Sequence, residues 1–431
     1  MLPGTKNLSR LLQLAHKYGP CSPLKGRKSK IPSLHQILID DQTRVNSIHS
    51  KISNQQYSPV ADSIVKLPAN DGGFLGTTNF LVKIGLGKPG QNFTVEFDTG
   101  SSLTWIQCQP CGANQCYTQQ DPYFNSSASS TYSNTPCSSN ACSQLNSAGY
   151  AQSSCITNCI YHVYYGDGSS SQRYFATDTL TLSSSDVFPN FEFGCGENSQ
   201  GTFGSYKLNS STDGLLGFGR GQISMVSQTT QKYGGLFSYC LPSTTNSTGF
   251  LAFGSQVGNS SSNAQYTPLL IDSNNSSYYY LNMTGISVRG KKLSISETVF
   301  KTSGTIIDSG TVITRLAPTP YLGLRSAFRQ AMSKYSAAAS PDSLFDTCYN
   351  LSGYSKVELP TIVLHFGGGA EWNVDQSGIV FGGNSTPFCL AFAGNRDATQ
   401  LAILGNTQQQ TFEVVYDIVR EKLGFGAGAC S

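Results

Sequence analysis

A five-residue pattern that occurs twice constrains this chain most. Residues 97–101 read Phe-Asp-Thr-Gly-Ser, and residues 307–311 read Ile-Asp-Ser-Gly-Thr. Each copy follows a short apolar run, so each Asp is expected in a sharp turn at the buried end of a strand. One copy alone would indicate no more than an Asx-type turn. Two copies with matched flanks, one in each half of the chain, predict two similar lobes whose carboxylates meet where the lobes join.

A pair of carboxylates in that position has a defined chemistry. Asp98 and Asp308 cannot both ionise cheaply when they are neighbours, so together they hold one proton over a window of pH. In that state the pair can take a proton from one water molecule and so activate it. Gly100 and Gly310 allow close backbone approach and leave amide N–H groups free to hold the acids. We expect no cofactor and no metal ion.

The composition predicts mostly β structure in more than one domain. The chain has 431 residues, only 12% of them charged, and its short Val, Ile and Thr runs alternate with Gly, Asn, Ser and Pro. Phe80–Leu86 and Gln91–Phe97 read as a hairpin. Three segments read as helices: Ser9–Tyr18, Ser33–Ile52 and Pro320–Tyr335. No apolar run is long enough to span a bilayer.

Cysteines and glycosylation sequons indicate an oxidising compartment and a glycoprotein. The chain has 13 cysteines. Asn-x-Ser/Thr sequons occur at Asn92, Asn125, Asn209, Asn246, Asn275, Asn282, Asn350 and Asn384. Residues 1–20 contain no sustained apolar core of the signal-peptide type, so we expect a truncated signal upstream of this sequence. The expected location is extracellular or vacuolar.

Charge is distributed unevenly along the chain. Residues 1–66, the basic segment, contain ten Lys and Arg against three Asp, a net charge of +7, whereas the remaining residues carry −4. Together with the change from helical to β-rich patterns, this separates a basic helical segment (1–70) from a body that we divide into an N-terminal β lobe (71–255) with a Cys-rich insert (108–159) and a C-terminal β lobe (256–431). A solvated tail is the alternative interpretation of the basic segment.

The repeat extends further and, with its neighbours, resembles the pepsin-like aspartic peptidases. Beside the two Asp turns, the matching elements are residues 165–169 (Tyr-Gly-Asp-Gly-Ser), 213–217 (Asp-Gly-Leu-Leu-Gly) and 403–405 (Ile-Leu-Gly). They come in the family's order and cover roughly residues 75–431. The Cys-rich insert, residues 104–111 (Thr-Trp-Ile-Gln-Cys-Gln-Pro-Cys) and residues 191–196 (Phe-Glu-Phe-Gly-Cys-Gly) are more similar to the plant nepenthesin-like branch.

The resemblance implies a bilobal fold of two β-barrel-like lobes with a central cleft, a few short helices and a helical prosegment. It implies that Asp98 and Asp308 are the catalytic pair of an endopeptidase that acts at acidic pH on polypeptides, as a monomer that pepstatin-type compounds inhibit. It implies dyad support from Thr99, Gly100, Ser101, Ser309, Gly310 and Thr311. It also implies a flap over the substrate, carrying Tyr165, Gly166, Asp167 and Gly168, with Trp105 as the partner of the tyrosine.

Two simpler interpretations compete with the flap. Trp105 could be an ordinary core residue, and residues 164–169 could form an ordinary hairpin with surface tyrosines. Asp167 is not expected to act as a third catalytic acid, because an Asp at a hairpin tip is solvated.

The cysteines beyond residue 66 number twelve, which suits disulfide bonds. The Cys108-x-x-Cys111 spacing also fits a pair of zinc ligands, but an insert without an apolar core needs covalent links, and we reject the zinc interpretation. The resemblance suggests the pairs Cys108–Cys111, Cys116–Cys195, Cys137–Cys159, Cys142–Cys155, Cys240–Cys430 and Cys348–Cys389. Cys21 is left over in the basic segment.

Zymogens of the resembled family keep a basic prosegment across an acidic cleft, and a +7 segment beside a −4 body fits that arrangement. We expect Lys66, or a lysine among residues 25–30 (Lys25, Lys28 and Lys30), to pair with the ionised dyad. Acidification would protonate the dyad and charge His16, His35 and His49, so the contacts would weaken. Cleavage is expected within residues 67–73.

Two other functions compete with proteolysis. A relative of the same fold could be a catalytically weak or inactive inhibitor or binding protein, but such relatives commonly lack part of the dyad, which is complete here. A DNA-associated plastid protease is a minor alternative. The mature form is not expected to bind nucleic acid, because the basic residues lie in the removable segment and the body is slightly acidic.

Overall fold

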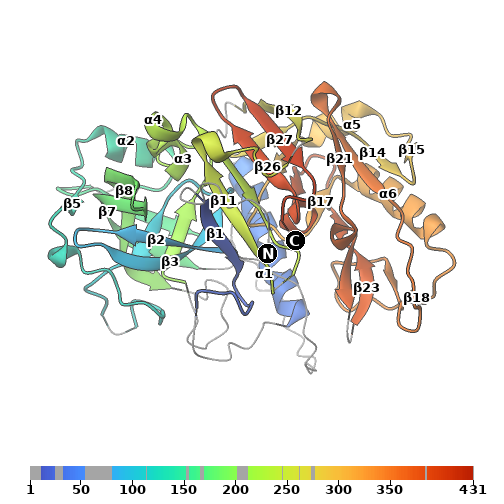
Figure 1. Ribbon diagram of the computed structural model, residues 1–431, viewed down its shortest axis with the longest axis horizontal. Helices are drawn as coiled ribbons and strands as arrows, with labels where there is room; N and C mark the ends of the chain where they lie inside the picture. Colours follow the sequence, from blue (N-terminus) through green and yellow to red (C-terminus); the bar gives the residue numbers. More distant parts are fainter. Residues whose placement is uncertain are drawn as a thin grey trace.

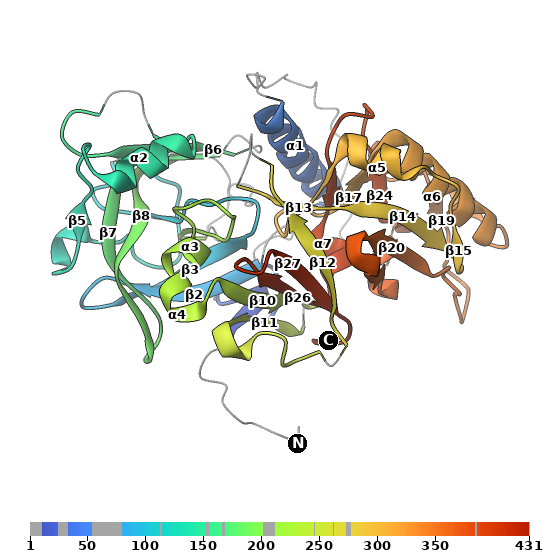
Figure 2. The same cartoon turned by 90° about the horizontal axis from the view of Figure 1, so that it is seen from above.

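The computed structural model describes residues 11–24, 33–53, 80–112, 114–151, 155–165, 169–200, 212–244, 246–261, 263–272, 277–383 and 386–430. Figure 1 and Figure 2 show a lobe on each side of helix α1 (Leu34–Ile52), the N-terminal lobe in cyan to green and the C-terminal lobe in yellow to red. Strands dominate both lobes. The predicted fold class, mostly β and bilobal with a few helices, is confirmed.

The N-terminal lobe contains ten named strands and three short helices in the described part of the chain. The strands are β2 (Phe80–Leu86), β3 (Gln91–Asp98), β4 (Trp105–Gln107), β5 (Ser133–Asn134), β6 (Ile160–Tyr164), β7 (Ser170–Ser183), β8 (Asp186–Gln200), β9 (Gly214–Gly217), β10 (Leu236–Cys240) and β11 (Thr248–Phe253). The helices are α2 (Asn140–Ser147), α3 (Met225–Gln228) and α4 (Thr230–Tyr233). The predicted hairpin of β2 and β3 forms in full register from Leu81 opposite Glu96 to Leu86 opposite Gln91.

The C-terminal lobe follows with shorter strands. They are β12 (Gln265–Leu270), β13 (Tyr279–Leu281), β14 (Met283–Val288), β15 (Lys291–Lys292), β16 (Thr305–Ile307), β17 (Thr314–Leu316), β18 (Ala337–Ala338), β19 (Cys348–Tyr349), β20 (Ile362–Phe366), β21 (Glu371–Asn373), β22 (Val380–Gly383), β23 (Thr386–Leu390), β24 (Phe392–Gly394), β25 (Ala402–Leu404), β26 (Glu413–Asp417) and β27 (Lys422–Gly426). The helices are α5 (Glu297–Ser303), α6 (Pro318–Ala331) and α7 (Asn406–Gln409). Helix α6 begins two residues before the predicted Pro320, and its predicted apolar face, which includes Leu324 and Phe328, is buried.

The sequence repeat corresponds to a structural repeat. In the N-terminal lobe β3 runs parallel to β9, and β4 pairs antiparallel with β9 and parallel with β8. In the C-terminal lobe β16, β25, β17 and β24 make the same four-strand arrangement. The glycine of each repeat donates its N–H to a threonine hydroxyl: Gly217 to Thr104 (3.1 Å) and Gly405 to Thr314 (3.0 Å). Asp98 therefore ends β3 and Asp308 directly follows β16, and these two strands are held by equivalent neighbours.

A shared sheet joins the lobes beneath the Asp turns. Strand β10 pairs with β11 and with β26, β27 pairs with β26 and β12, and β1 (Leu11–His16) lies between β2 and β11. Aromatic rings pack on this sheet: Phe237 stacks on Tyr416 with ring centroids 4.4 Å apart, and Phe97 meets Tyr239 edge-on at 5.1 Å. The residue before Asp98 is thus anchored in the core that connects the two lobes.

The basic segment was predicted to contain two helices, and one prediction is wrong. Residues 9–18 were expected to be helical, but Leu11–His16 form β1, whose Leu14 and Ala15 are buried. Backbone pairing on both sides outweighs the weak local helix preference of a short apolar run. The second helix is confirmed: α1 begins after Ser33, whose hydroxyl accepts a hydrogen bond from the Gln36 N–H, and its apolar stripe is buried. No helix in the described ranges combines the length and apolar character needed to cross a membrane.

Two of the six expected disulfide pairs are confirmed, Cys240–Cys430 and Cys348–Cys389. The other four pairings are wrong, because the bonds formed are Cys108–Cys195, Cys111–Cys116, Cys137–Cys155 and Cys142–Cys159. In the insert the sulfurs of Cys142, Cys155 and Cys159 lie within 4.8 Å of one another, so sequence order could not choose among nearly equivalent partners. Each of these sulfurs is in a disulfide and offers no free thiolate for a metal. Cys21 is free and exposed.

Candidate active site

The two repeated turns hold their carboxylates in the same way. Asp98 Oδ1 accepts the Gly100 N–H (3.0 Å) and its Oδ2 accepts the Ser101 hydroxyl (2.8 Å). Asp308 Oδ1 accepts the Gly310 N–H (3.1 Å) and its Oδ2 accepts the Thr311 hydroxyl (2.6 Å). Both side chains are nearly inaccessible to solvent, at 4% and 0%. In each turn a Gly N–H therefore holds Oδ1, the inner oxygen that faces the other acid, and a hydroxyl group holds Oδ2, the outer oxygen.

The turns are also bonded to each other across the lobes. The Thr99 N–H donates to the Ser309 hydroxyl oxygen (3.1 Å), and the Ser309 N–H donates to the Thr99 hydroxyl oxygen (2.9 Å). The two hydroxyls are 3.2 Å apart. Buried polar groups from separate halves of the chain thus satisfy one another, which fixes the spacing between the two acids. All eight dyad and support residues predicted from the sequence lie together here.

Arg44 of α1 lies between the two carboxylates. Its Nη2 atom is 2.7 Å from Asp98 Oδ1 and 2.8 Å from Asp308 Oδ1, and its Nε donates to Asp308 Oδ2 at 2.9 Å. One nitrogen atom touches the inner oxygens of both acids, so these acids are close neighbours. The sequence predicted a lysine here. The partner is instead Arg44, and Lys25, Lys28, Lys30 and Lys66 lie outside the described residues.

The contact changes the proton affinity of the groups involved. Burial acts to raise the pKa of Asp308, but the charge of Arg44 and the hydrogen bonds from Arg44, Thr311 and Gly310 outweigh it and leave that pKa below its ordinary value. Burial acts to lower the pKa of Arg44, and the two carboxylates outweigh it and hold that pKa well above its ordinary value. The ion pair is therefore favoured at neutral pH, and acid breaks it only by protonating the carboxylates.

Glycine is required where the guanidinium approaches the turns. A Cβ placed on Gly310 would collide with the guanidinium carbon of Arg44, and one placed on Gly100 would collide with both Asp308 Oδ1 and Arg44 Nη2. The two glycines of the repeat therefore leave open the space between the acids, as predicted from the sequence. The same space would be needed by a water molecule and a peptide group.

Apolar packing holds α1 against the C-terminal lobe. Ile37 and Leu38 belong to a cluster with Val312, Ile313, Phe345, Phe381 and Ala391. Val45 and Ile48 belong to a second cluster with Tyr278, Tyr280, Ile306, Leu401 and Ile403. All these partners are in the C-terminal lobe, so α1 rests on that lobe and reaches Asp98 of the other lobe through Arg44.

The three histidines of the basic segment that were predicted to respond to acid have different surroundings. Burial lowers the pKa of His16 to about 4, and burial also lowers the pKa of His49, although its contact with the Leu401 carbonyl opposes this. His35 is largely exposed and lies 2.7 Å from Asp342. Charging His16 or His49 would weaken the docking of the segment, as expected. For His35 the expectation of repulsion is wrong, since a charged ring there would attract Asp342.

The predicted flap pair is in contact. The Trp105 indole N–H donates to the Tyr165 hydroxyl (2.6 Å), and Trp105 is fully buried. The Tyr165 N–H donates to the Ser169 carbonyl (2.8 Å), which closes the base of a hairpin between β6 and β7. Gly166, Asp167 and Gly168, the predicted tip, lie outside the described residues. Burial, opposed by the Trp105 hydrogen bond, raises the pKa of Tyr165 well above its ordinary value, so the phenol stays protonated.

Several residues of the site were missed from the sequence. Tyr150, from the Cys-rich insert, bonds to the Ser102 backbone, and its burial raises its pKa to about 12. Nothing in the sequence marks it. Asp41 and Arg44 did carry a signal, because both are charged residues on the otherwise apolar stripe of a predicted helix, and a charge on a buried face needs a partner.

Comparisons with known proteins matched the chain to family models, to relatives and to solved structures. Two family models match, described as "Xylanase inhibitor N-terminal" over residues 80–255 and "Xylanase inhibitor C-terminal" over residues 278–427. An aspartyl protease family protein of Arabidopsis thaliana is 46% identical over 100% of this chain and 89% of its own length. The aspartic proteinase nepenthesin-2 of Nepenthes gracilis is 36% identical over 83% of this chain and 79% of its own length. Among solved structures, that of a protein named edgp matches with a TM-score of 0.66 and 19% identity, over 83% of this chain and 96% of that one, which supports the fold alone.

Proposed function

The chain belongs to the plant pepsin-like aspartic peptidases, and we propose that it hydrolyses internal peptide bonds at acidic pH with a water molecule held between Asp98 and Asp308. The observation that supports this most is the convergence of both Oδ1 atoms on one point, which Arg44 Nη2 now occupies. A water molecule at that point would touch both acids at hydrogen-bonding distance.

The residues of the two turns account for the steps of the reaction. The two acids share one proton. The ionised carboxylate removes a proton from the water while the oxygen of that water forms a bond to the peptide carbonyl carbon. The protonated carboxyl donates to the carbonyl oxygen. Collapse of the resulting diol breaks the C–N bond, and the amine leaves with a proton returned by the dyad. Ser101 and Thr311, bonded to the outer oxygens, keep both carboxylates oriented throughout.

The basic segment would act as an intramolecular inhibitor. Arg44 fills the place of the catalytic water, and α1 lies on the C-terminal lobe beside the dyad. Strand β1 adds a second attachment, and Lys17 forms a buried ion pair with Glu96 at 2.7 Å. We propose that acid releases this segment, and that the division into a prosegment (1–70) and two lobes (71–255 and 256–431) describes the zymogen. The flap role of Tyr165 belongs to the same proposal, supported by its contact with Trp105.

Cellular context follows from the family and the disulfides. The protein is proposed to be secreted or vacuolar and glycosylated at exposed sequons such as Asn92, Asn246 and Asn350. Six disulfides among the described residues favour an oxidising compartment.

The decisive experiment measures peptide hydrolysis by the purified full chain after incubation at about pH 4. The wild type is compared with Asp98→Asn and with Asp397→Asn, an exposed aspartate far from the site in sequence. We expect Asp98→Asn to lower kcat by at least about 10²- to 10⁴-fold, pepstatin to inhibit the wild type, and Asp397→Asn to behave as wild type. Full activity in Asp98→Asn would exclude the dyad mechanism.

The same incubation tests inhibition by the basic segment. The chain should shorten by about 65–75 residues as activity rises, because the segment ahead of the lobes is where cleavage is expected. Arg44→Ala should hydrolyse peptides before processing to a greater extent than wild type. A full-length chain that is already fully active would contradict the zymogen proposal.

A second candidate function is inhibition of another protein, favoured by the descriptions of the two family models. The complete dyad argues against it. If the processed chain hydrolysed no peptide at any acidic pH while both turns remained folded, this candidate would replace the first.

A further inference from the structure

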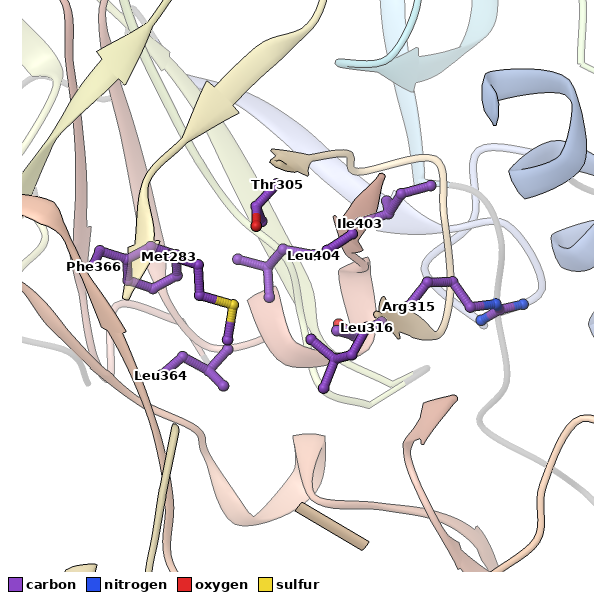
Figure 3. Close-up of a pocket in the computed structure, with 10 residues that line it drawn as sticks. Met283, Thr305, Arg315, Leu316, Leu364, Phe366, Ile403 and Leu404 are labelled. Carbon is purple, nitrogen blue, oxygen red and sulfur yellow. The ribbon is translucent and has the colours of Figure 1, made fainter. Parts of the chain in front are cut away.

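Helix α1 makes a second buried charge contact with the body, and the proposed reaction does not use it. Arg315 of β17 pairs with Asp41 of α1, with Nη2 2.9 Å from Oδ2. Both side chains are shielded from solvent, at 1% and 0% exposure. Figure 3 shows the Arg315 side chain directed away from the apolar cavity lined by Met283 and Leu404.

The Asp41 carboxylate accepts hydrogen bonds from several donors. Its Oδ1 accepts the Val312 N–H (2.6 Å), and its Oδ2 accepts the Ile313 N–H (3.3 Å) as well as the Arg315 guanidinium. Arg315 Nη1 donates to the Ile313 carbonyl (2.7 Å), which fixes the guanidinium beside these amides. The donors all come from one short stretch of the C-terminal lobe, so they form a preorganised site for a carboxylate.

Without α1 this site would lack an anion. Among the described residues, the carboxylate paired with Arg315 comes only from α1, and Arg315 Nε has no hydrogen-bond partner. A guanidinium held in a largely apolar wall is unfavourable without a counter-charge. Once α1 has left, the site would therefore favour another carboxylate in place of Asp41.

Two observations relate this site to the dyad and to the predicted flap. The donors Val312 and Ile313 directly follow the Asp308 turn, and Asp41 is three residues from Arg44 on one helix, an axial distance of about 4.5 Å. An extended peptide covers that distance in about one to two residues. In addition, Arg315 occupies the position in its lobe that Trp105, the partner of Tyr165, occupies in the other.

We propose that Arg315, with the N–H groups of Val312 and Ile313, is a subsite that selects an acidic side chain of the polypeptide substrate within about three residues of the scissile bond. This inference rests on the proposed endopeptidase function, because Asp41 fills the subsite until the basic segment leaves.

The first test compares substrates on the acid-processed protein at about pH 5, where a substrate glutamate is ionised. Fluorogenic peptides carry Glu or Gln at each of the three positions on either side of the scissile bond. At one position we expect kcat/KM for Glu to exceed that for Gln by about 10- to 100-fold. In Arg315→Gln this ratio should fall to about one, in Arg315→Lys it should be partly retained, and in the control Arg396→Gln, at an exposed arginine, it should be unchanged.

The second test needs only the wild-type processed protein, so it holds even if Arg315→Gln fails to fold. A synthetic peptide of residues 33–53 competes with substrate, and its inhibition constant is compared with those of the same peptide carrying Asp41→Asn or Asp40→Asn. All three peptides keep Arg44 for the dyad, and the last two have the same net charge. We expect Asp41→Asn to weaken inhibition by about 10-fold or more and Asp40→Asn to have little effect.

The outcomes separate the two proposals. Hydrolysis with no Glu preference at any position, or equal inhibition by all three peptides, would overturn the subsite while leaving the peptidase in place. Absence of all hydrolysis by the processed wild type would overturn both.

Discussion

The two lobes use one loop design for shared chemistry and differ in what surrounds it. In both lobes an Asp lies at the end of a strand or directly after it, a Gly N–H and a hydroxyl group hold its carboxylate, and a Thr hydroxyl accepts the N–H of a distant Gly. At the equivalent position after this Thr, the N-terminal lobe has Trp105, in contact with Tyr165, and the C-terminal lobe has Arg315, paired with Asp41. The two lobes therefore share the groups that hold the acids and differ at the positions that flank them.

The basic segment also attaches to the two lobes in different ways. Helix α1 packs its apolar stripe on the C-terminal lobe, whereas β1 adds to the sheet beside β2 of the N-terminal lobe. Four experiments test how far the two lobes differ.

The largest effect is expected where α1 packs on the C-terminal lobe. Leu38→Ala removes a buried side chain and should weaken docking of α1 by about 2–5 kcal/mol. Hydrogen exchange of the α1 amides in the full-length chain at neutral pH measures this loss. Ile39→Ala, at a 39% exposed position on the same helix, is the matched control and should change protection little. Equal protection in both variants would show that the apolar stripe does not hold α1.

The second largest effect is expected on the pH dependence of β1 docking, through His16. The His16 pKa of about 4 lies below its ordinary value of 6.5, so the released segment binds a proton before the docked one as pH falls. Docking should therefore be fully stabilised above about pH 6.5 and lose about 3 kcal/mol by pH 4. His16→Phe keeps a ring against Phe80 and removes the titration, so processing at pH 4 should slow.

Docking of each protein at neutral pH provides the control for His16→Phe, because the variant lacks at every pH the ring nitrogen that accepts the Tyr18 N–H (3.1 Å). The loss of docking between neutral pH and pH 4 should be about 3 kcal/mol smaller in the variant than in the wild type. If processing of His16→Phe at pH 4 kept the wild-type rate, His16 would not contribute to acid release.

The third experiment tests whether the hydrogen bonds between the two Asp turns contribute equally to stability. Thr99→Ala and Ser309→Ala each remove a hydroxyl and leave a buried N–H of the other lobe unpaired, at a cost of about 1–3 kcal/mol. Thermal unfolding of the two variants should show similar destabilisation. The exposed hydroxyl of Thr302 gives the control, and Thr302→Ala should unfold like wild type. Clearly unequal losses from Thr99→Ala and Ser309→Ala would mean that the two turns are not energetically equivalent.

The smallest effect is expected at the flap. Tyr165→Phe removes the hydroxyl that accepts the Trp105 N–H and should change kcat/KM by about 2- to 10-fold. Tyr164→Phe, at the neighbouring 63% exposed ring, should leave kcat/KM at the wild-type value. Matching effects of the two changes would count against a specific role for the Trp105 contact.

The sequence alone identified those parts of the molecule that have a local sequence pattern or that occur twice in the chain. The dyad, its hydroxyl and glycine supports, the β2–β3 hairpin, the amphipathic α1 and the buried face of α6 all have patterns confined to a few consecutive residues. A pattern of this kind fixes local geometry, and the repeat added the one long-range inference, that the two turns meet.

Only the tertiary structure decided which distant groups became partners. Residues 11–16 became a strand because two strands lay beside them, and Arg44 rather than a lysine reached the dyad because the packing of α1 places it there. Two disulfides of the insert, Cys137–Cys155 and Cys142–Cys159, formed with other partners than predicted where three of the sulfurs lie within 4.8 Å of one another. Arg315 and Asp41 are 274 positions apart in the chain. Asp41 stands out as a charge on the apolar stripe of α1, but nothing in the local sequence indicates that Arg315 is its partner. Their pairing depends on where two surfaces meet, and that is set by the sum of many apolar contacts rather than by any short stretch of sequence.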